Sequence, residues 1–474
     1  MRLTRRDLLA GGAAAAALGA TGIYELVEHL RRAPRRLPTA DRAPEQHLLH
    51  GLRVIEDEGV EVIVPPLHHQ LVTAKLRVEP RRPDLRGARH ALEEALLRLD
   101  EEFESSARGL GLTVAWGLPY FERYVPAQAA RHLPIDLRAS STRERPMRAL
   151  IDAIRFPSDP EDVLLEDNDL AVLLRSDEPA HVTKGAQAIF GELDALFETT
   201  SIRKGFAAGG YDGGRSLPKQ MAVAAGVPGA DLIPDTAELF LGFTSTQKDG
   251  LGPLGIANFE TLGLVDLGPR NYFRAGTSMH VSHILENLEA WYLDFDFAER
   301  VTTTFSPERR AREGTQTVPQ KPGAVADSGG VVRDFHRFGA IGHSASIQTT
   351  SRLQRDVVAA DGKVYRKGTA IPQRADFNTL DNPFFWSVRP ERDRQQAEPA
   401  AGVHFVVFNP TSDDFHRNRL AMDGVLPDGT RLPFEPRARG QGLNSVLQTT
   451  HRQNFLVPPR RARSFPLVEL LTDG

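Results

Sequence analysis

QLVTAKLRV, residues 70–78, is the stretch that decides the fold, because its apolar and polar residues alternate as they do in a half-buried strand. ARHALEEALLRLDEEF follows at 88–103, with Ala and Leu at helical spacing and charges on the opposite face. That pattern predicts an amphipathic helix. LTVAW at 112–116 then predicts a second strand, so the folded part of the chain opens with a β-α-β unit.

The same order repeats downstream. Asp169–Arg175 (DLAVLLR) predicts a strand, His181–Phe197 a helix and Thr199–Phe206 another strand. Two successive β-α-β units are the split pattern of a ferredoxin-like sheet. Because the strands alternate rather than run continuously apolar, we expect antiparallel sheets with helices on one face, not a fully buried parallel sheet.

A second set of elements with a similar order lies in the C-terminal part. It comprises strands at Met279–Ile284, around 340–349 and at Val403–Phe408, helices at Glu289–Arg300 and Asp413–Ala421, and long loops at 305–335 and 365–400. The sequence therefore predicts an α+β protein of two ferredoxin-like halves. The expected divisions are a leader at 1–24, a tether at 25–59, a first half at 60–206, a Gly-rich connector at 207–270 and a second half at 271–474.

The N-terminus carries the features of a twin-arginine export leader. LTRRDLL at 3–9 holds Arg5 and Arg6, Arg2 adds a third positive charge, and residues 8–24 carry no charge. A basic head before a short, weakly apolar run is typical of an export signal, and about 20 residues are needed to span a bilayer. We therefore expect transport by the twin-arginine translocase to a periplasmic, extracellular or outer-side anchored location. An ordinary helix or a permanent anchor is the alternative.

The composition excludes several classes of function. The 474 residues include 58 Lys+Arg and 62 Asp+Glu, a net charge of −4, whereas a nucleic-acid binder shows a strong basic excess. The chain has no cysteine, which excludes disulfides and a lipidated N-terminal cysteine. No H-E-x-x-H, paired C-x-x-C or P-loop motif is present, so zinc hydrolysis and nucleotide use have no support.

Several segments, in their order along the chain, resemble the exported dye-decolourising (Dyp-type) haem peroxidases, including the deferrochelatase branch. ELFLGFTSTQKDG (238–250) is similar to the family's G-F-x-D-G segment, and GHSASIQTTSRL (342–353) to the segment that holds the axial histidine. KVYRKGTAIP (363–372) resembles the segment of the distal arginine, and GVHFVVFNPTSDDFHRNRL (402–420) the last strand and helix. The likeness extends over about 400 residues.

The resemblance implies haem b held through its iron by His343, with hydrogen bonds around the ligand setting its basicity. Counting back from Arg352 instead places Ala345 or Ser346 at the ligand position. His280 is an alternative axial ligand. His280 and His283 are three residues apart on a predicted strand, so they point to opposite faces and cannot easily bind one ion together.

Peroxide cleavage needs an acid/base group and a cation on the other side of the haem. The resemblance assigns the cation to Arg366. It places Ser245 at the position of the acid, whereas Asp249-Gly250 restores the D-G pair after four inserted residues. GGYDG at 209–213 offers Asp212 as a further candidate, ranked below Asp249.

Three functions follow from these residues. The first is an exported haem protein that acts with hydrogen peroxide as a peroxidase or haem-processing enzyme, with a small-molecule reductant or haem as partner. The second is a divergent binding or structural module on the same scaffold, without haem. The third is a haem-free metal site at His280 and His283. No nucleic acid is expected as a partner, and homo-oligomer formation stays open.

Overall fold

Both β-α-β units expected near the N-terminus are present in the computed structural model, which describes residues 42–210, 215–268, 271–319, 327–382 and 385–472. The first half consists of β3 (His68–Leu76), α2 (Arg82–Glu102), β4 (Gly111–Gly117), β8 (Leu170–Ser176), α6 (Pro179–Ala186) continued by a π-helical turn at Gln187–Gly191, and β9 (Phe197–Phe206). Its strands lie in the order β9-β3-β8-β4. Numbered along the chain, these are the fourth, first, third and second strands of the half. Neighbouring strands are antiparallel, as a ferredoxin-like sheet requires.

The second half repeats that order. Its main elements are β11 (Thr277–Glu286), a π-helical turn (Ala290–Asp294), α8 (Phe297–Thr304), α9 (Ser328–Phe338), α10 (His343–Ser351), β14 (Gln373–Arg374), β15 (Phe377–Leu380), β16 (Ala401–Asn409), α11 (Ser412–Met422) and β17 (Leu447–Val457). Its main strands lie in the order β17-β11-β16-β15, which is again the fourth, first, third and second strand along the chain. The α+β prediction with two ferredoxin-like halves is confirmed.

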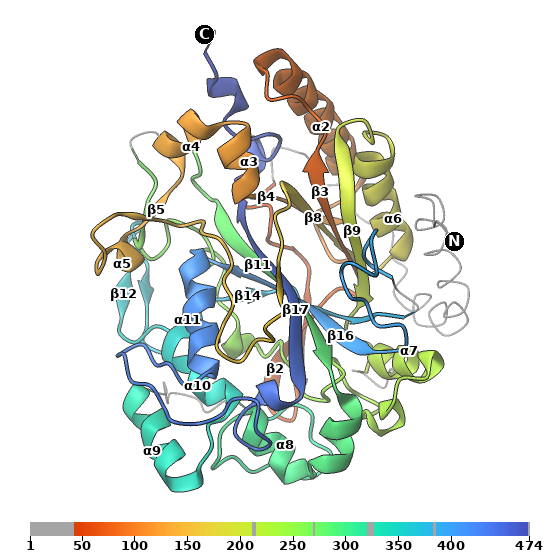
Figure 1. Ribbon diagram of the computed structural model, residues 1–474, viewed down its shortest axis with the longest axis vertical. Helices are drawn as coiled ribbons and strands as arrows, with labels where there is room; N and C mark the ends of the chain where they lie inside the picture. Colours follow the sequence, from red (N-terminus) through yellow and green to blue (C-terminus); the bar gives the residue numbers. More distant parts are fainter. Residues whose placement is uncertain (1–41, 211–214, 269–270, 320–326, 383–384, 473–474) are drawn as a thin grey trace.

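The two halves share one closed sheet. β17 pairs with β4 of the first half, and β15 pairs with β9, while β11 and β17 pair with each other. The strand path therefore returns to its start, and its interior is filled by an apolar cluster that includes Leu71, Leu173, Met279, Val281 and Phe455. Figure 1 shows α2 and α6 outside the upper part of this sheet and α8 to α11 around its lower part.

Closure of the sheet explains why the strands are more buried than expected. β4 and β8 are buried at every residue, and β3 at all but two. One face of these strands packs against α2 and α6, and the other faces the interior of the closed sheet. The expectation of half-buried strands was therefore wrong for the first half, although the antiparallel pairing was right.

Three second-half elements differ from prediction. Residues 340–349, expected as a strand, contain the start of α10, which begins at His343 after Gly342. A Cβ at Gly342 would lie 2.4 Å from the carbonyl oxygen of Phe305, so this turn requires glycine. The helix expected at Glu289–Arg300 is divided, because the side chain of Asp296 caps a new helix in a capping box with Glu299. α9 lies partly within the expected loop 305–335.

The expected tether at 25–59 is partly built into the fold. Gln46 is 1% exposed, and its Nε2 donates to the carbonyl oxygens of Val114 and Pro458 at 2.8 Å each. β1 (Arg53–Asp57) forms a hairpin with β2 (Val60–Val64). The leader at 1–24 lies outside the described residues. Within the described ranges, no helix has the length and apolar character that crossing a membrane demands.

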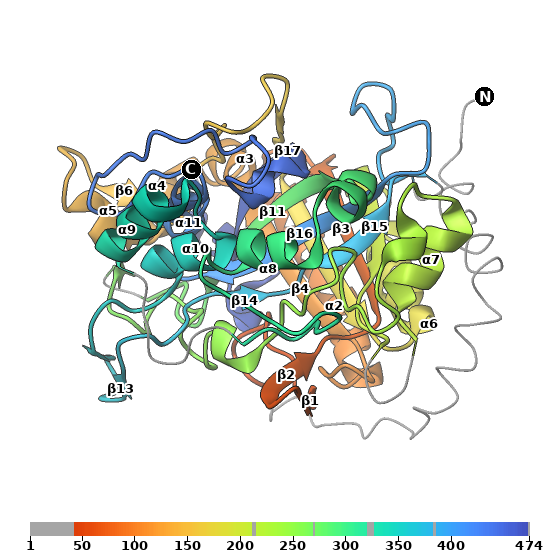
Figure 2. The same cartoon turned by 90° about the horizontal axis from the view of Figure 1, so that it is seen from below.

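The remaining elements are short. They are α3 (Leu118–Arg123), α4 (Pro126–His132), β5 (Ile135–Asp136), α5 (Leu137–Ser140), β6 (Met147–Arg148), β7 (Leu164–Leu165), α7 (Leu217–Ala225), β10 (Val265–Asp266), β12 (Val357–Val358) and β13 (Val364–Tyr365). In Figure 2, which looks at the molecule from below, α8 to α11 lie on the side of the second-half strands. The space between those helices and strands contains the candidate site.

Candidate functional site

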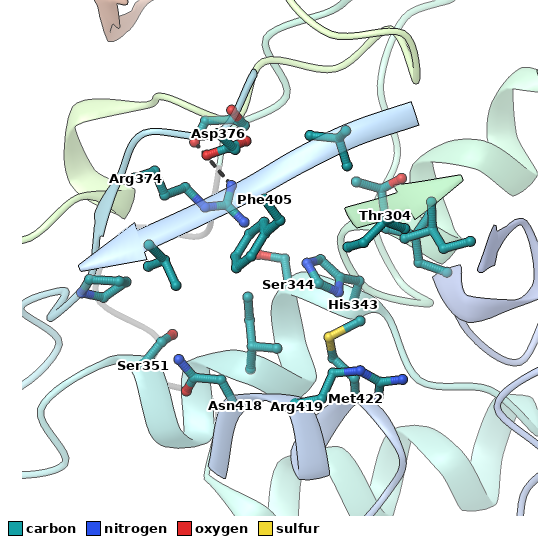
Figure 3. Close-up of a pocket in the computed structure, with 18 of the residues that line it drawn as sticks. Thr304, His343, Ser344, Ser351, Arg374, Asp376, Phe405, Asn418, Arg419 and Met422 are labelled. Atoms are coloured by element: carbon teal, nitrogen blue, oxygen red, sulfur yellow. Dashed lines mark hydrogen bonds between the residues drawn. The ribbon is translucent and has the colours of Figure 1, made fainter. Parts of the chain in front are cut away.

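A cavity of about 220 Å³ lies between strands β11 and β16 and helices α10 and α11. Its walls are largely apolar, and its lining includes Leu241, Phe243, Ile284, Phe305, Ile347, Val403, Phe405 and Met422. Polar side chains enter from several elements and converge on this space (Figure 3). An apolar pocket with a few convergent polar groups is the usual form of a small-molecule or cofactor site.

His343, the first residue of α10, lines the cavity. Its Nδ1 is enclosed and has no hydrogen-bond partner. Burial lowers the pKa of His343 to about 3, and the positive charges of Arg374 and Arg419 act in the same direction. The imidazole is therefore neutral at physiological pH, which is the form that binds a metal.

Arg374 and Asp376 enter the cavity from the opposite wall, beside β16. Arg374 ends β14, which pairs with β16, and Asp376 follows two residues later. Nη1 of Arg374 donates to the carbonyl oxygen of Ser245 at 3.4 Å, and the guanidinium lies 5.7 Å from the centre of the Phe405 ring. In Figure 3 the Phe405 ring lies between Arg374 and His343. Burial raises the pKa of Asp376, and Arg374 opposes that rise.

Glu286, at the end of β11, is the second acid of the cavity. It is 9% exposed, and its Oε2 has no hydrogen-bond partner. Burial, with a contribution from the negative charge of Asp376, raises the pKa of Glu286 to about 8. At neutral pH this carboxyl group holds its proton, so it can donate a hydrogen bond into the cavity.

Two of the other residues expected at the site also line the cavity. Oγ of Ser245 is buried without a partner, and the backbone N–H of Ser245 donates to Oε2 of Glu238 at 3.2 Å. Arg352 follows α10, and its Nη1 donates to the carbonyl oxygen of Gly368 at 2.7 Å. Burial lowers the pKa of Arg352.

Two expected site residues lie elsewhere. Arg366 is 78% exposed and pairs with Asp356 at 2.6 Å, because it follows a short surface hairpin, β12–β13. Asp249 is exposed on a 3₁₀ turn, of which only Gly250 reaches the cavity. Asp212 lies outside the described residues. The structure therefore does not bring Arg366 or Asp249 to the side of the cavity that faces His343.

His280 is not available as an axial ligand. Its Nδ1 contacts Oδ1 of Asn454 at 2.7 Å, its Nε2 contacts Oγ of Ser282 at 2.6 Å, and its ring stacks on Phe415. His283 faces the interior of the closed sheet, next to His404, so the two histidines do point to opposite faces of β11. Over the described ranges, no three metal-binding side chains gather at one point. The haem-free metal site is not supported.

A buried ion network forms the floor of the cavity. Arg419 of α11 donates to Oδ1 of Asp423 at 2.7 Å, and Arg452 of β17 donates to Oδ1 of Asp159 at 2.5 Å. Oδ1 of Asp423 also accepts from Oγ of Ser158 at 2.7 Å and from Nδ2 of Asn444 at 3.0 Å. Since both floor arginines are paired with aspartates, Arg374 is the arginine best placed to meet a ligand.

Sequence reasoning found His343, Ser245 and Arg352 but missed Arg374, Asp376 and Glu286. Residues 365–400 were expected to be a long loop, so an arginine and an aspartate there carried no positional information. The one available signal was their spacing. Arg374 and Asp376 are two residues apart, so their side chains share one face if the segment is extended.

Comparison with known proteins identifies the fold of this chain. A model of the "Family of unknown function (DUF7405)" matches residues 66–459, and no curated protein matches the chain. The DyP-type peroxidase from Cellulomonas bogoriensis is 17% identical, with 88% of this chain and 96% of that chain covered and a TM-score of 0.51. The chain therefore has the fold of the Dyp-type peroxidases, as its sequence led us to expect.

Two further solved structures are similar over most of their length. A putative Dyp-type peroxidase from Shewanella oneidensis is 14% identical, with 86% of this chain and 96% of that chain covered and a TM-score of 0.47. A variant of DypB from Rhodococcus jostii RHA1, solved in complex with heme, is 13% identical, with coverages of 84% and 96% and a TM-score of 0.47.

Proposed function

Since the chain belongs to DUF7405, a family of unknown function, we propose its activity from the cavity: it binds haem and acts as a peroxide-dependent oxidoreductase. The observation that carries this proposal is His343. It is a neutral imidazole at the wall of an apolar cavity, opposite an arginine and an acid that line the same space. The fold agrees with the proposal but does not establish it, because function resides in the site.

The residues present fit haem. The apolar walls suit the porphyrin faces, and the neutral His343 offers a ring nitrogen to the iron. Arg374 and Arg352 are cations at the cavity wall that suit the propionate groups or an anionic ligand. When bound, haem supplies the iron centre at which peroxide is reduced.

The chain's own groups have separable roles in this proposal. Arg374 provides a permanent positive charge where negative charge develops, and it replaces Arg366 in that role. Asp376 accepts and returns a proton at its carboxylate, and its raised pKa brings it closer to neutral pH. Phe405 excludes water beside Arg374.

One feature favours a slower enzyme or a haem carrier on the same scaffold. A histidine that binds a metal usually donates its other N–H to a carboxylate or carbonyl, and this raises its basicity. Nδ1 of His343 has no such partner. A module that binds haem without rapid turnover is therefore the second candidate function.

Reconstitution with haem tests the proposal. The mature chain is titrated with haem, and the Soret band is recorded for wild type, His343→Ala and the matched control His336→Ala. His336 is exposed on α9 and lies away from the cavity. We expect a saturable band that His343→Ala removes or shifts and His336→Ala keeps. The same band in all three proteins would contradict the assignment of His343.

We further propose export by the twin-arginine translocase, supported by Arg5 and Arg6 ahead of the uncharged run. A reporter fused after residue 60 should reach the periplasm in a host with this pathway. Changing Arg5 and Arg6 together to Lys should abolish that export, and continued export of the double variant would contradict the proposal. The reductant is proposed to be a small molecule, because the cavity has the form of a small-molecule site.

A further inference from the structure

One end of the closed sheet contains a group of buried histidines that the proposed function does not use. His283, His404 and His451 lie around Trp386, with ring-centre distances of 4.9, 5.9 and 4.9 Å from its ring. All are at most 2% exposed. Burying so many ring nitrogens is costly unless they are hydrogen-bonded, so their arrangement needs an explanation.

Two of these histidines belong to a chain of polar contacts. Oδ1 of Asp381 lies 2.9 Å from Nε2 of His283. Nδ1 of His283 is 2.6 Å from Oγ1 of Thr450, which is 2.9 Å from Nδ1 of His451. The chain ends at Nε2 of His451, which is buried and has no partner.

The hydroxyl of Thr450 links the two rings. It has one hydrogen, so at least one of the two Nδ1 atoms must carry a proton and donate to Oγ1 of Thr450. Nε2 of His451 remains without a partner at the end of this chain.

His451 lines a second, polar pocket of about 260 Å³. Lys75, Arg389 and Arg392 line it together with four acids, and each acid has a cation beside it. The pairs are Asp167 with Lys75 at 2.7 Å, Glu198 with Arg389 at 3.7 Å, Asp393 with Arg392 at 3.5 Å, and Glu166 with the buried Arg203 at 2.5 Å. The walls therefore present no unpaired charge that would select an ion.

We infer that this pocket is a second binding site, and that it takes a small neutral polyhydroxylated molecule, one hydroxyl of which hydrogen-bonds to Nε2 of His451. Asn168, Thr199 and Thr200 add hydroxyl and amide groups to the same wall. The ligand class follows from two facts. His451 has a ring nitrogen without a partner, which a hydroxyl can satisfy as donor or as acceptor. The paired charges of the wall can exchange hydrogen bonds with hydroxyls without an added charge.

The test titrates the full chain with glucose and with two charged molecules of similar size, gluconate and glucosamine, by calorimetry. Glucose should bind more tightly than both. His451→Phe should weaken glucose binding about three- to tenfold, the effect of one lost hydrogen bond. His404→Phe is the matched control: it also replaces a buried histidine with an unbonded ring nitrogen, but His404 does not line the pocket.

A histidine-¹⁵N spectrum gives an independent readout. Added glucose should move the Nε2 resonance of His451 and leave those of His280 and His343 in place. If His451→Phe does not fold, Thr450→Val serves instead, because it removes the hydroxyl that holds the ring of His451 through Nδ1 and should also weaken glucose binding. The inference is overturned if gluconate or glucosamine binds more tightly than glucose, if glucose does not bind, or if the His451 resonance does not respond.

Discussion

Glu286→Gln should make the protein more stable at neutral pH and less sensitive to pH. The wild-type carboxyl group is buried at the end of β11, near the negative charge of Asp376, and its pKa is raised from 4.5 to about 8. Glutamine keeps the shape of the side chain and does not ionise. The variant therefore removes one titration and leaves the cavity lining otherwise similar.

The sign and size of the effect follow from the two pKa values. Below pH 4.5 the carboxyl is protonated in both the folded and the unfolded chain, so its ionisation does not change the free energy of unfolding. Between pH 4.5 and about 8 the unfolded chain releases the proton while the folded chain retains it, so stability falls as pH rises, by up to about 1.4 kcal/mol per pH unit. From pH 5 to pH 7 the loss is about 2.5 kcal/mol.

Urea unfolding of wild type and variant at pH 5 and pH 7 measures this loss. The difference in unfolding free energy between the two proteins should change by about 2.5 kcal/mol over this interval, with the variant gaining relative to wild type at pH 7. Taking this difference cancels the contributions of all other groups that titrate equally in both proteins. A difference that does not change with pH would refute a buried, protonated Glu286.

Two further outcomes are expected. Asp423→Asn should cost about 3 kcal/mol of unfolding free energy in urea, because the buried Arg419 loses its closer carboxylate and keeps only Asp159 at 3.3 Å. A loss below about 1 kcal/mol would contradict a buried ion pair. Arg374→Gln should lower peroxide-dependent oxidation of a dye by the haem-loaded protein about 100-fold, whereas Arg366→Gln, which alters an exposed ion pair, should leave the rate unchanged. The opposite ranking of these two variants would restore Arg366 as the distal cation.

The first half of the chain was predictable because its signals are local. The alternation in residues 70–78 and the amphipathic pattern in 88–103 each report one element and its neighbour in sequence, and β3 and α2 form there. Closure of the sheet was not predictable in this way. It depends on β17 meeting β4, strands separated by more than 300 residues, and no local pattern encodes that pairing.

The candidate site was predictable only where a motif marked it. His343 was found because its segment resembles that of an axial histidine, although the segment forms a helix and not a strand. Arg366 was chosen over Arg374 because Lys367 and Gly368 completed a familiar triplet. Which of two arginines eight residues apart enters the cavity depends on the pairing of β14 with β16, a contact between segments far apart in the sequence.

The position of β17 in the closed sheet has a consequence for how the protein is made. This strand lies between β4 and β11, yet it is the last of the described strands along the chain. Synthesis runs from the N-terminus, so β4 and β11 leave the ribosome before the strand that joins them. The sheet therefore cannot close, nor Arg452 complete the floor of the cavity, until β17 has emerged. Any cofactor that needs the finished cavity must be loaded after that point.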